Sequence, residues 1–289
     1  MSPEAPAADE LVLLGVKGGP SIRPGGAMPS ASLLRMGGQT VVIDCGLGVA
    51  KSLVEAGIAL TEIDAVFITH LHSDHVLELG PLLYTAWTSG LSKPIALFGP
   101  PGIEAYWQGF LASMAFDQTI RIEDEGRVPI GELITLSIID EGPVTDLAGI
   151  AVSALRVDHP PVTECYALRF ESAAKAIVFS ADTCYFPPLA AFAEGAALLV
   201  HEAMLTDGIE ALVQRLGNAQ RLRAHLLASH TKAADVGRIA SAADVNRLVL
   251  NHLVPVDDPR FSEADWRREV SQNWPGATIV GHDGARIAF

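Results

Sequence analysis

The segment Thr69-His70-Leu71-His72-Ser73-Asp74-His75 is the most informative stretch of this chain. From His70 to His75 it follows the pattern HxHxDH, which places three imidazoles and one carboxylate close together. These groups suit Zn²⁺ and similar first-row ions. His70 and His72 can face one way while Asp74 and His75 face another, so one loop can serve two metals. A chance cluster of surface histidines is the alternative, and ligand-type residues that recur later in the chain count against it.

Ligand-type residues follow four separate apolar runs, each of which is predicted to be a strand. VFIT precedes His70, ALRVD precedes His159, AIVFSA precedes Asp182, and RLVLN precedes His252. A single His after a strand is usually a capped or solvated residue. Four strand ends that all carry ligand types favour one shared site, because loops on a rigid scaffold carry function.

The HxHxDH run resembles the signature of the metallo-β-lactamase-fold hydrolases, in particular the branch of ribonuclease Z, the class II cyclic-nucleotide phosphodiesterases and certain arylsulfatases. The resemblance extends from about Leu11 to Phe289. Its shorter segments are VVIDCG at 41–46, VDH at 157–159, SADT at 180–183, HEAM at 201–204, SHT at 229–231 and NHL at 251–253. It implies an α/β fold, the αββα sandwich, with two mixed β-sheets face to face and helices outside.

The same resemblance implies two divalent metal ions. The first site would be His70, His72 and His159, and the second Asp74, His75 and His252, with Asp182 bridging both. Zn²⁺ is expected from the nitrogen-rich donor set, and Mn²⁺ or Fe²⁺ remain alternatives. The nucleophile would be a metal-bridging hydroxide, which Asp74 would help to orient. Asp44, at the end of VVID, would support the metal-binding loop; its alternative role is a helix N-cap.

Glu202 in HEAM and His230 in SHT match the pair that marks the ribonuclease Z branch, in which the Glu holds the His and the His protonates the leaving group. An imidazole can be protonated near neutral pH, and a carboxylate on one ring nitrogen fixes its orientation. A structural hydrogen bond between Glu202 and His230 is the alternative. His201 and His225 are expected to be structural, and His282 to be exposed.

These features predict a binuclear hydrolase of small phosphodiesters or aryl sulfates, with Asp74, Glu202 and His230 as catalytic residues. Hydrolysis of a lactone, carboxylic ester or β-lactam at the same metals is the alternative. A non-hydrolytic metal-binding module is a third hypothesis, which the full ligand set argues against. The expected partner is a small-molecule ester, and the resemblance suggests a homodimer.

The composition limits the partners and the compartment. The chain of 289 residues is 49% hydrophobic, and its formal net charge of −14 repels polyanions, so nucleic acid is not expected. Ribonuclease Z enzymes carry a long flexible arm that grips tRNA, and no such insertion is visible, so tRNA 3′-processing is the least favoured activity. The three cysteines form no metal or disulfide spacing, and buried thiols are expected.

We expect residues 1–10 to be a flexible leader and 11–289 a single hydrolase domain. No apolar run reaches about 18 residues, so no membrane span is expected. The N-terminus shows no signal peptide, which favours the cytoplasm. A periplasmic or secreted protein trimmed of its signal sequence would look the same.

Periodicity predicts several elements with functional bearing. We expect one helix over 75–86, a strand over 247–250, and a terminal hairpin over 277–289 that turns at 282–284. Residues 207–227 should form one or two helices, interrupted at 217–218. Part of this region, 209–223, carries arginines that are either a solvated helix face or a lid over a small anion.

Overall fold

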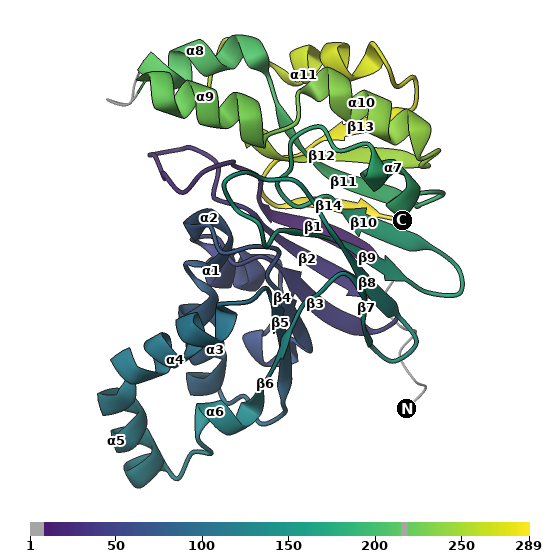
Figure 1. Ribbon diagram of the computed structural model, residues 1–289. Coiled ribbons are helices and arrows are strands. Elements are labelled where there is room, and N and C mark those ends of the chain that lie inside the picture. Colours follow the sequence, from purple (N-terminus) through teal and green to yellow (C-terminus); the bar gives the residue numbers. More distant parts are fainter. Residues whose placement is uncertain (1–8, 215–218) are drawn as a thin grey trace.

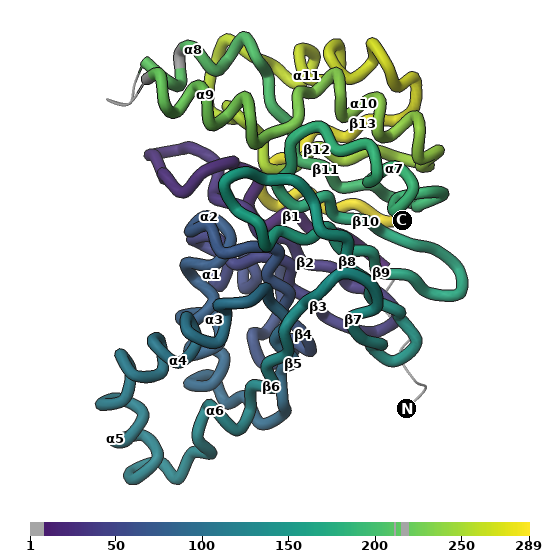
Figure 2. The backbone as a smooth tube through the Cα atoms, in the orientation of Figure 1, coloured from purple at the N-terminus to yellow at the C-terminus, as the bar shows by residue number. Residues whose placement is uncertain are grey.

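Two β-sheets lie face to face in this protein, and helices cover the outer face of each (Figure 1). The computed structural model describes residues 9–214 and 219–289. The tube in Figure 2 shows the same layers, with the N-terminal half of the chain below and the C-terminal half above. The predicted αββα sandwich with mixed sheets is therefore confirmed.

The first sheet has the strand order β14-β1-β2-β3-β4-β5-β6. Pairing is antiparallel from β14 to β3 and parallel from β3 to β6. The strands are β1 (Glu10–Gly15), β2 (Ala31–Met36), β3 (Gln39–Ile43), β4 (Ala65–Phe67), β5 (Ile95–Gly99), β6 (Ile134–Ile138) and β14 (Ala285–Ala288).

The second sheet repeats this arrangement with the order β13-β12-β11-β10-β9-β8-β7. Pairing is parallel from β13 to β10 and antiparallel from β10 to β7. The strands are β7 (Gly142–Asp146), β8 (Ala151–Arg156), β9 (Tyr166–Glu171), β10 (Ala176–Phe179), β11 (Leu198–Met204), β12 (Arg247–Val254) and β13 (Ala277–Val280).

The helices fall into two groups, one for each sheet (Figure 1). Those on the side of the first sheet are α1 (Val49–Glu55), η1 (Leu60–Glu62), α2 (Ser73–Val76), α3 (Leu79–Thr88), α4 (Ile103–Ser113), α5 (Ala115–Glu125) and α6 (Ile130–Leu133). Those on the side of the second are α7 (Pro188–Phe192), α8 (Thr206–Gln214), α9 (Ala219–Ser229), α10 (Ala233–Ala242) and α11 (Glu263–Ser271).

The main core lies between the sheets, because alternate residues of each strand face the opposite sheet. In β1, Leu11 and Leu13 join this central core, whereas Val12 and Leu14 face the helices outside the first sheet. Phe67 meets Phe170 of the other sheet edge to face, with ring centroids 5.2 Å apart. This shared core fits the expected single domain over 11–289, which stays a prediction.

The terminal hairpin expected over 277–289 is wrong. β13 pairs in parallel with β12 of the second sheet, whereas β14 pairs antiparallel with β1 of the first. The residues between them cross from one sheet to the other, and the N–H of Gly284 donates to the carbonyl of Leu13. Turn residues between two apolar runs predicted a reversal, but they do not specify which partner each strand takes.

Two further boundaries differ from the predictions. The expected helix over 75–86 is divided into α2 and α3, which are separated by Leu77 and Glu78. The strand expected to end at 250 continues to Val254, so His252 lies inside β12 rather than after it. His252 has a positive φ of 42°, and the pairing of β12 with β11 shifts register between Glu202 and Ala203. This irregularity turns His252 out of the regular strand.

Other expectations concern the ends, the thiols and the membrane. β1 begins at Glu10, the last residue of the expected leader, and residues 1–8 lie outside the described residues. Cys45 and Cys165 are buried free thiols, as expected, whereas Cys184 is partly exposed. In the described part of the chain, no helix has the length and apolar character needed to cross a membrane.

Candidate metal centre

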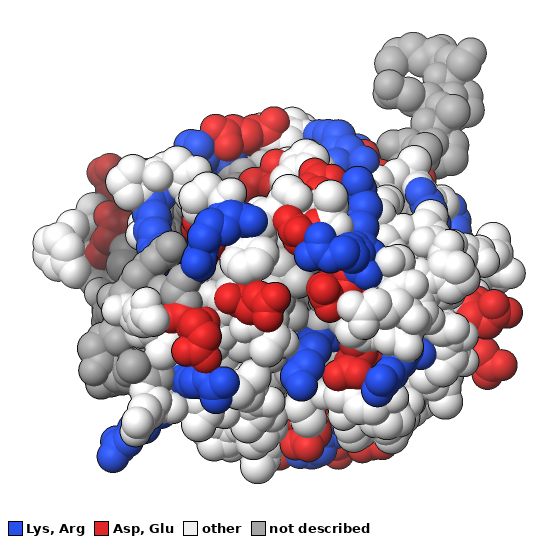
Figure 3. Space-filling model, turned by 90° about the horizontal axis from the view of Figure 1, so that it is seen from above, with Lys and Arg blue, Asp and Glu red and all other residues white. Residues whose placement is uncertain are grey.

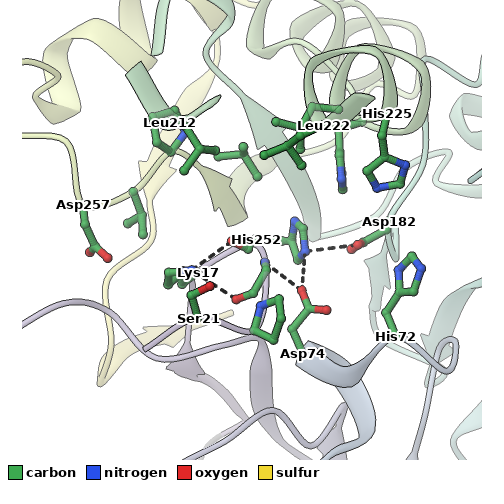
Figure 4. A pocket seen from close by; sticks show the side chains of 18 of the residues that line it. Lys17, Ser21, His72, Asp74, Asp182, Leu212, Leu222, His225, His252 and Asp257 are labelled. Carbon is green, nitrogen blue, oxygen red and sulfur yellow. Dashed lines mark hydrogen bonds and ion pairs between the residues drawn. The ribbon is translucent and has the colours of Figure 1, made fainter. Parts of the chain in front are cut away.

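The predicted ligands meet at one edge of the sandwich, between the two sheets. The strand β4 ends at Phe67 and delivers the His70–His75 segment, which runs into the short helix α2. The loop after β1 and the pair α8–α9 border the same pocket (Figures 1 and 4). Strand ends from both sheets therefore contribute to one site, as the sequence predicted.

The first group of donor atoms comes from His70, His72, His159 and Asp182. Nδ1 of His72 lies 3.1 Å from Nε2 of His70 and 3.1 Å from Nε2 of His159. Oδ2 of Asp182 is 3.7 Å from Nε2 of His70 and 3.8 Å from Nε2 of His159. The four donor atoms thus surround one point.

The second group comes from Asp74, His75, Asp182 and His252, all of which are buried. Nε2 of His252 lies 3.3 Å from Oδ2 of Asp74 and 3.1 Å from Oδ2 of Asp182. Nε2 of His75 lies 3.6 Å and 3.3 Å from the same two oxygens. Oδ2 of Asp182 therefore belongs to both groups, which is the place of a bridging ligand.

The spacing of these atoms fits metal ions. Ligand atoms about 2.0–2.1 Å from a tetrahedral Zn²⁺ lie about 3.3 Å from one another. The observed separations of 3.1–3.8 Å match that value. In the described residues, Nε2 of His75 and Oδ1 of Asp182 are buried without a hydrogen-bond partner, which is costly unless another group satisfies them. The donor set and the fold together indicate a divalent-metal site.

Charge in the site also fits a cation. Burial lowers the pKa of His72 to about 4 and lowers that of His70 well below its usual value, so both rings are neutral, as metal ligation requires. Burial alone would raise the pKa of Asp74 and Asp182, but the histidines beside them hold both values well below the usual range. Burial disfavours the charged form of His252, yet Asp182 outweighs it and raises that pKa to about 10. The carboxylates of the second group therefore stabilise a positive charge placed among them.

Backbone and side-chain acceptors fix the orientation of the histidine rings. Nδ1 of His159 donates to the carbonyl of Ser229 at 2.9 Å. Nδ1 of His75 donates to Oδ2 of Asp44 at 2.7 Å. The Thr69 hydroxyl donates to Asp44 at 3.0 Å, so it accepts from Nδ1 of His70 at 3.1 Å. Such contacts leave Nε2 of these rings for a metal. Asp44 thus holds the two ends of the His70–His75 segment in place through Thr69 and His75.

Glu202 and His230 form the predicted pair. Nδ1 of His230 lies 3.0 Å from Oε1 and 3.1 Å from Oε2 of Glu202, and both residues are buried. The N–H of Thr183 donates to Oε1 of Glu202 at 2.7 Å and holds the carboxylate in place. Burial lowers the pKa of His230, but Glu202 outweighs it, and the net pKa is raised. His230 lines the pocket and can present a proton there.

A pocket of about 290 Å³ opens over the two groups (Figure 4). The loop after β1 forms one side of it, where the N–H of Gly19 donates to Oδ2 of Asp74 at 2.7 Å. Lys17 and Arg23 of this loop line the pocket, and Nζ of Lys17 donates to the carbonyls of Gly18 and Gly19. The apolar part of the pocket lining includes Leu212 of α8 and Leu222 and Leu226 of α9.

Several aromatic and charged residues lie away from this pocket. Tyr84, Trp87 and Trp107 belong to the core under the helices of the first sheet. His282 is exposed and His201 is buried, as expected. In the region 209–223, Arg223 pairs with Glu210 on the surface. Arg215 and the interruption at 217–218 lie outside the described residues.

Sequence reasoning missed two pocket residues. Lys17 lies in a Gly- and Pro-rich loop, and nothing in its local sequence marks it as a pocket residue. His225 was expected to be structural, but it lines the pocket from α9. Its spacing from His230 gave no signal, because the orientation of α9 depends on tertiary packing.

Comparisons with known proteins agree with this site. The family model of the anti-Pycsar protein Apyc1 matches residues 10–234. A ribonuclease Z of Mycobacterium sp. (strain KMS) is 34% identical over 280 residues, with 96% of this chain and 95% of the relative covered. Another, of Mycobacterium bovis (strain BCG / Pasteur 1173P2), is 32% identical, with 96% and 97% covered.

Among solved structures, the metallo-β-lactamase fold protein YhfI from Bacillus subtilis has a TM-score of 0.70 at 23% identity, with 97% of this chain and 99% of that chain covered. The short form of human tRNase Z has a TM-score of 0.67 at 21% identity, with 96% and 98% covered. At these identities the structures show the fold alone. The chain therefore belongs to the metallo-β-lactamase-fold hydrolases, in the group that the Apyc1 model and its ribonuclease Z relatives define.

Proposed function

We propose that this protein is a binuclear metal-dependent phosphodiesterase that acts on small phosphodiesters. The observation that carries the proposal is the pair of donor groups that share Oδ2 of Asp182. The proposed ligands are His70, His72 and His159 for the first ion, Asp74, His75 and His252 for the second, and Asp182 for both. Zn²⁺ is proposed because nitrogen donors predominate, with Mn²⁺ or Fe²⁺ as alternatives.

When bound, two such ions supply an activated water and neutralise charge that develops on the phosphoryl group. Residues of the chain would orient the attacking water and protonate the leaving group. Oδ2 of Asp74 is held by the Gly19 N–H, and we propose that its other oxygen accepts a hydrogen bond from the attacking water and fixes its direction. The remaining task is to protonate the leaving group.

His230 is proposed as the general acid. Its Nδ1 is held by Glu202, which leaves Nε2 to donate a proton to the departing oxygen. A poor leaving group such as an alkoxide needs this proton, whereas p-nitrophenolate needs it little. The pKa of His230 is raised because Glu202 stabilises the charged form, and this favours the protonated ring that a general acid needs.

The charge of the pocket supports an anionic substrate. Its lining carries two cationic side chains, Lys17 and Arg23, and three carboxylates, Asp74, Asp182 and Asp257. Two divalent cations would therefore leave the pocket positively charged in a chain whose net charge is −14. A phosphodiester gains from this field, whereas a neutral lactone or carboxylic ester does not. Aryl sulfates share the anionic character and remain within the proposal.

A second candidate is processing of tRNA 3′ ends, which the names of the ribonuclease Z relatives favour. This finding weighs against the expectation that nucleic acid is no partner. Two observations favour a small substrate. Residues 160–181, which separate two of the proposed ligands, form only β9, β10 and short connections, with no arm. On the face seen in Figure 3, acidic and basic side chains are interspersed, without a continuous basic surface.

The test compares four substrates on protein loaded with Zn²⁺ or Mn²⁺, with a chelated control. They are bis(p-nitrophenyl) phosphate, p-nitrophenyl sulfate, a simple lactone and a precursor tRNA with a 3′ trailer. The proposal expects metal-dependent turnover of the phosphodiester. Turnover of the lactone alone would refute it and make Glu202 and His230 structural residues. Accurate cleavage of the precursor tRNA, far faster than the small diester, would favour the second candidate.

A further inference from the structure

Glu78 lies between α2 and α3, close after the metal-binding segment, and belongs to neither donor group. Its carboxylate accepts two backbone hydrogen bonds, from the N–H of Gly48 at 2.5 Å and from that of Ala50 at 3.0 Å. Its own N–H donates to the carbonyl of Cys45 at 2.9 Å. Three hydrogen bonds therefore tie Glu78 to residues 44–50, which we call the support segment.

The support segment also contacts the metal-binding segment directly. The carboxylate of Asp44 accepts from Nδ1 of His75 at 2.7 Å and from the N–H of Thr69 at 2.8 Å. The next residue, Cys45, donates its N–H to the carbonyl of His75 at 2.6 Å. The two segments are thus joined at Asp44 on one side and at Glu78 on the other. The position of the support segment determines where the Asp44 carboxylate meets the His75 ring.

The support segment has little freedom to move towards the metal-binding segment. A Cβ on Gly46 would come within 2.6 Å of the carbonyl oxygen of Asp74, so the two backbones are already in close contact. Asp44 has a φ of 61°, a left-handed conformation that residues with a side chain adopt rarely and keep only where surrounding contacts enforce it. The support segment can therefore relax only away from the metal-binding segment, and the hydrogen bonds of Glu78 oppose that movement.

We propose that Glu78 is a positioning residue of the second metal group and that it acts through Asp44 on His75. Nε2 of His75 is a proposed ligand, and the hydrogen bond from Nδ1 to Asp44 aims it at the metal. Without the Glu78 carboxylate, the support segment loses two of its hydrogen bonds and moves away. The metal must then reorder its ligand on binding, so its affinity falls. This inference rests on the proposed ligand set and not on the substrate.

The first test is competition for Zn²⁺ with a chromophoric chelator, on metal-free Glu78→Gln. The amide keeps the shape of the side chain but has one acceptor oxygen instead of two. Glu78→Gln should bind the weaker-bound ion about tenfold less tightly than wild type. An affinity that stays within about twofold of wild type would overturn the role of Glu78.

Asp265→Asn is the matched control. It also removes a carboxylate that accepts a backbone N–H at the start of a helix, that of Ser262 at 2.7 Å, but in α11. This variant should lose stability without losing metal affinity. If both variants lose affinity equally, the effect is general destabilisation and the positioning role is wrong.

A double-mutant cycle tests the path through Asp44. In an Asp44→Asn background, Glu78→Gln should change the affinity by less than about twofold, because the contact that Glu78 supports is already lost. Additive losses of the two substitutions would contradict an action of Glu78 through Asp44.

A third readout needs no metal. In the metal-free protein, hydrogen exchange of the Cys45 amide, which bonds the carbonyl of His75, should be about tenfold faster in Glu78→Gln than in wild type and unchanged in Asp265→Asn. Equal exchange in all three proteins overturns the inference. If the wild type binds two ions but hydrolyses no phosphodiester, the proposed function fails, whereas affinity and exchange still decide the role of Glu78.

Discussion

Asp44→Asn is expected to weaken metal binding although Asp44 is in neither donor group. Asp44 is buried and has a positive φ of 61°, a backbone conformation that Asn also tolerates, so the substitution adds little strain. Its two oxygens accept from the N–H and hydroxyl of Thr69 and from Nδ1 of His75. An amide has only one oxygen, and if this faces the Thr69 N–H, the NH₂ group faces His75.

Two donors would then meet, and the ring of His75 would shift its proton from Nδ1 to Nε2 to avoid this. Nε2 is the atom that lies 3.3 Å from Oδ2 of Asp182, so its protonation removes a ligand. Loss of a partner that orients a ligating histidine costs about 10–100-fold in metal affinity, or about 1.4–2.7 kcal/mol. A hydrogen bond to a charged group contributes about 1.5–3 kcal/mol, which agrees with that range.

The assay is competition for Zn²⁺ with a chromophoric chelator, on metal-free protein at neutral pH. Asp64→Asn is the matched control, because Asp64 also accepts a backbone N–H, that of Thr40 at 2.8 Å, away from the metal groups. Asp44→Asn should lose at least tenfold in affinity for the weaker-bound ion, whereas Asp64→Asn should not. Equal affinities of the two variants, within about twofold, would refute the reasoning.

Three further predictions follow from the same contacts. His230→Ala should slow hydrolysis of an alkyl phosphodiester by about 10²–10⁴-fold, but that of a p-nitrophenyl ester far less; equal losses in a leaving-group series would remove the acid role. Asp182→Ala should lose both the metal content and the turnover, and full retention of either would contradict the bridging role. The Ser262 N–H and hydroxyl lower the pKa of Asp265 to about 2 in the capping box of α11, so this stabilisation is present above about pH 4 and is lost as the pH falls through about 2. Asp265→Asn should therefore unfold at lower urea than wild type at pH 7, and the difference should shrink as the pH falls towards 2; a pH-independent difference would contradict this.

The sequence predicted the part of this protein in which chemistry and local pattern coincide. HxHxDH, His159 and Asp182 follow short apolar strands, and the sandwich brings these strand ends to one edge. The spacing of ligand-type residues along a loop is a property of the local sequence, so the HxHxDH segment could be recognised without knowledge of the packing. Glu202 and His230 could be paired only through the resemblance, because they lie on β11 and after α9, and nothing in their spacing indicates a contact.

Features that depend on tertiary contacts were missed. The strand β6 alternates apolar and polar residues, but it is short and mostly exposed at the edge of its sheet, and it was not predicted. The terminal strands β13 and β14 have the sequence pattern of a hairpin, yet β13 pairs with a strand of the second sheet and β14 with a strand of the first. His225 reaches the pocket because α9 packs above β12, with Leu226 and Val254 in one apolar cluster. None of these partners can be read from the local sequence.

The central claim is that two metal ions, held by groups that share Asp182, carry out phosphodiester hydrolysis. The most direct measurement is a titration of metal-free protein with Zn²⁺ or Mn²⁺, during which turnover of bis(p-nitrophenyl) phosphate and bound metal are followed together. We predict that activity rises until two ions are bound per chain and that a chelator abolishes it. Full activity with one ion, or any turnover that persists in the chelated protein, would contradict the claim.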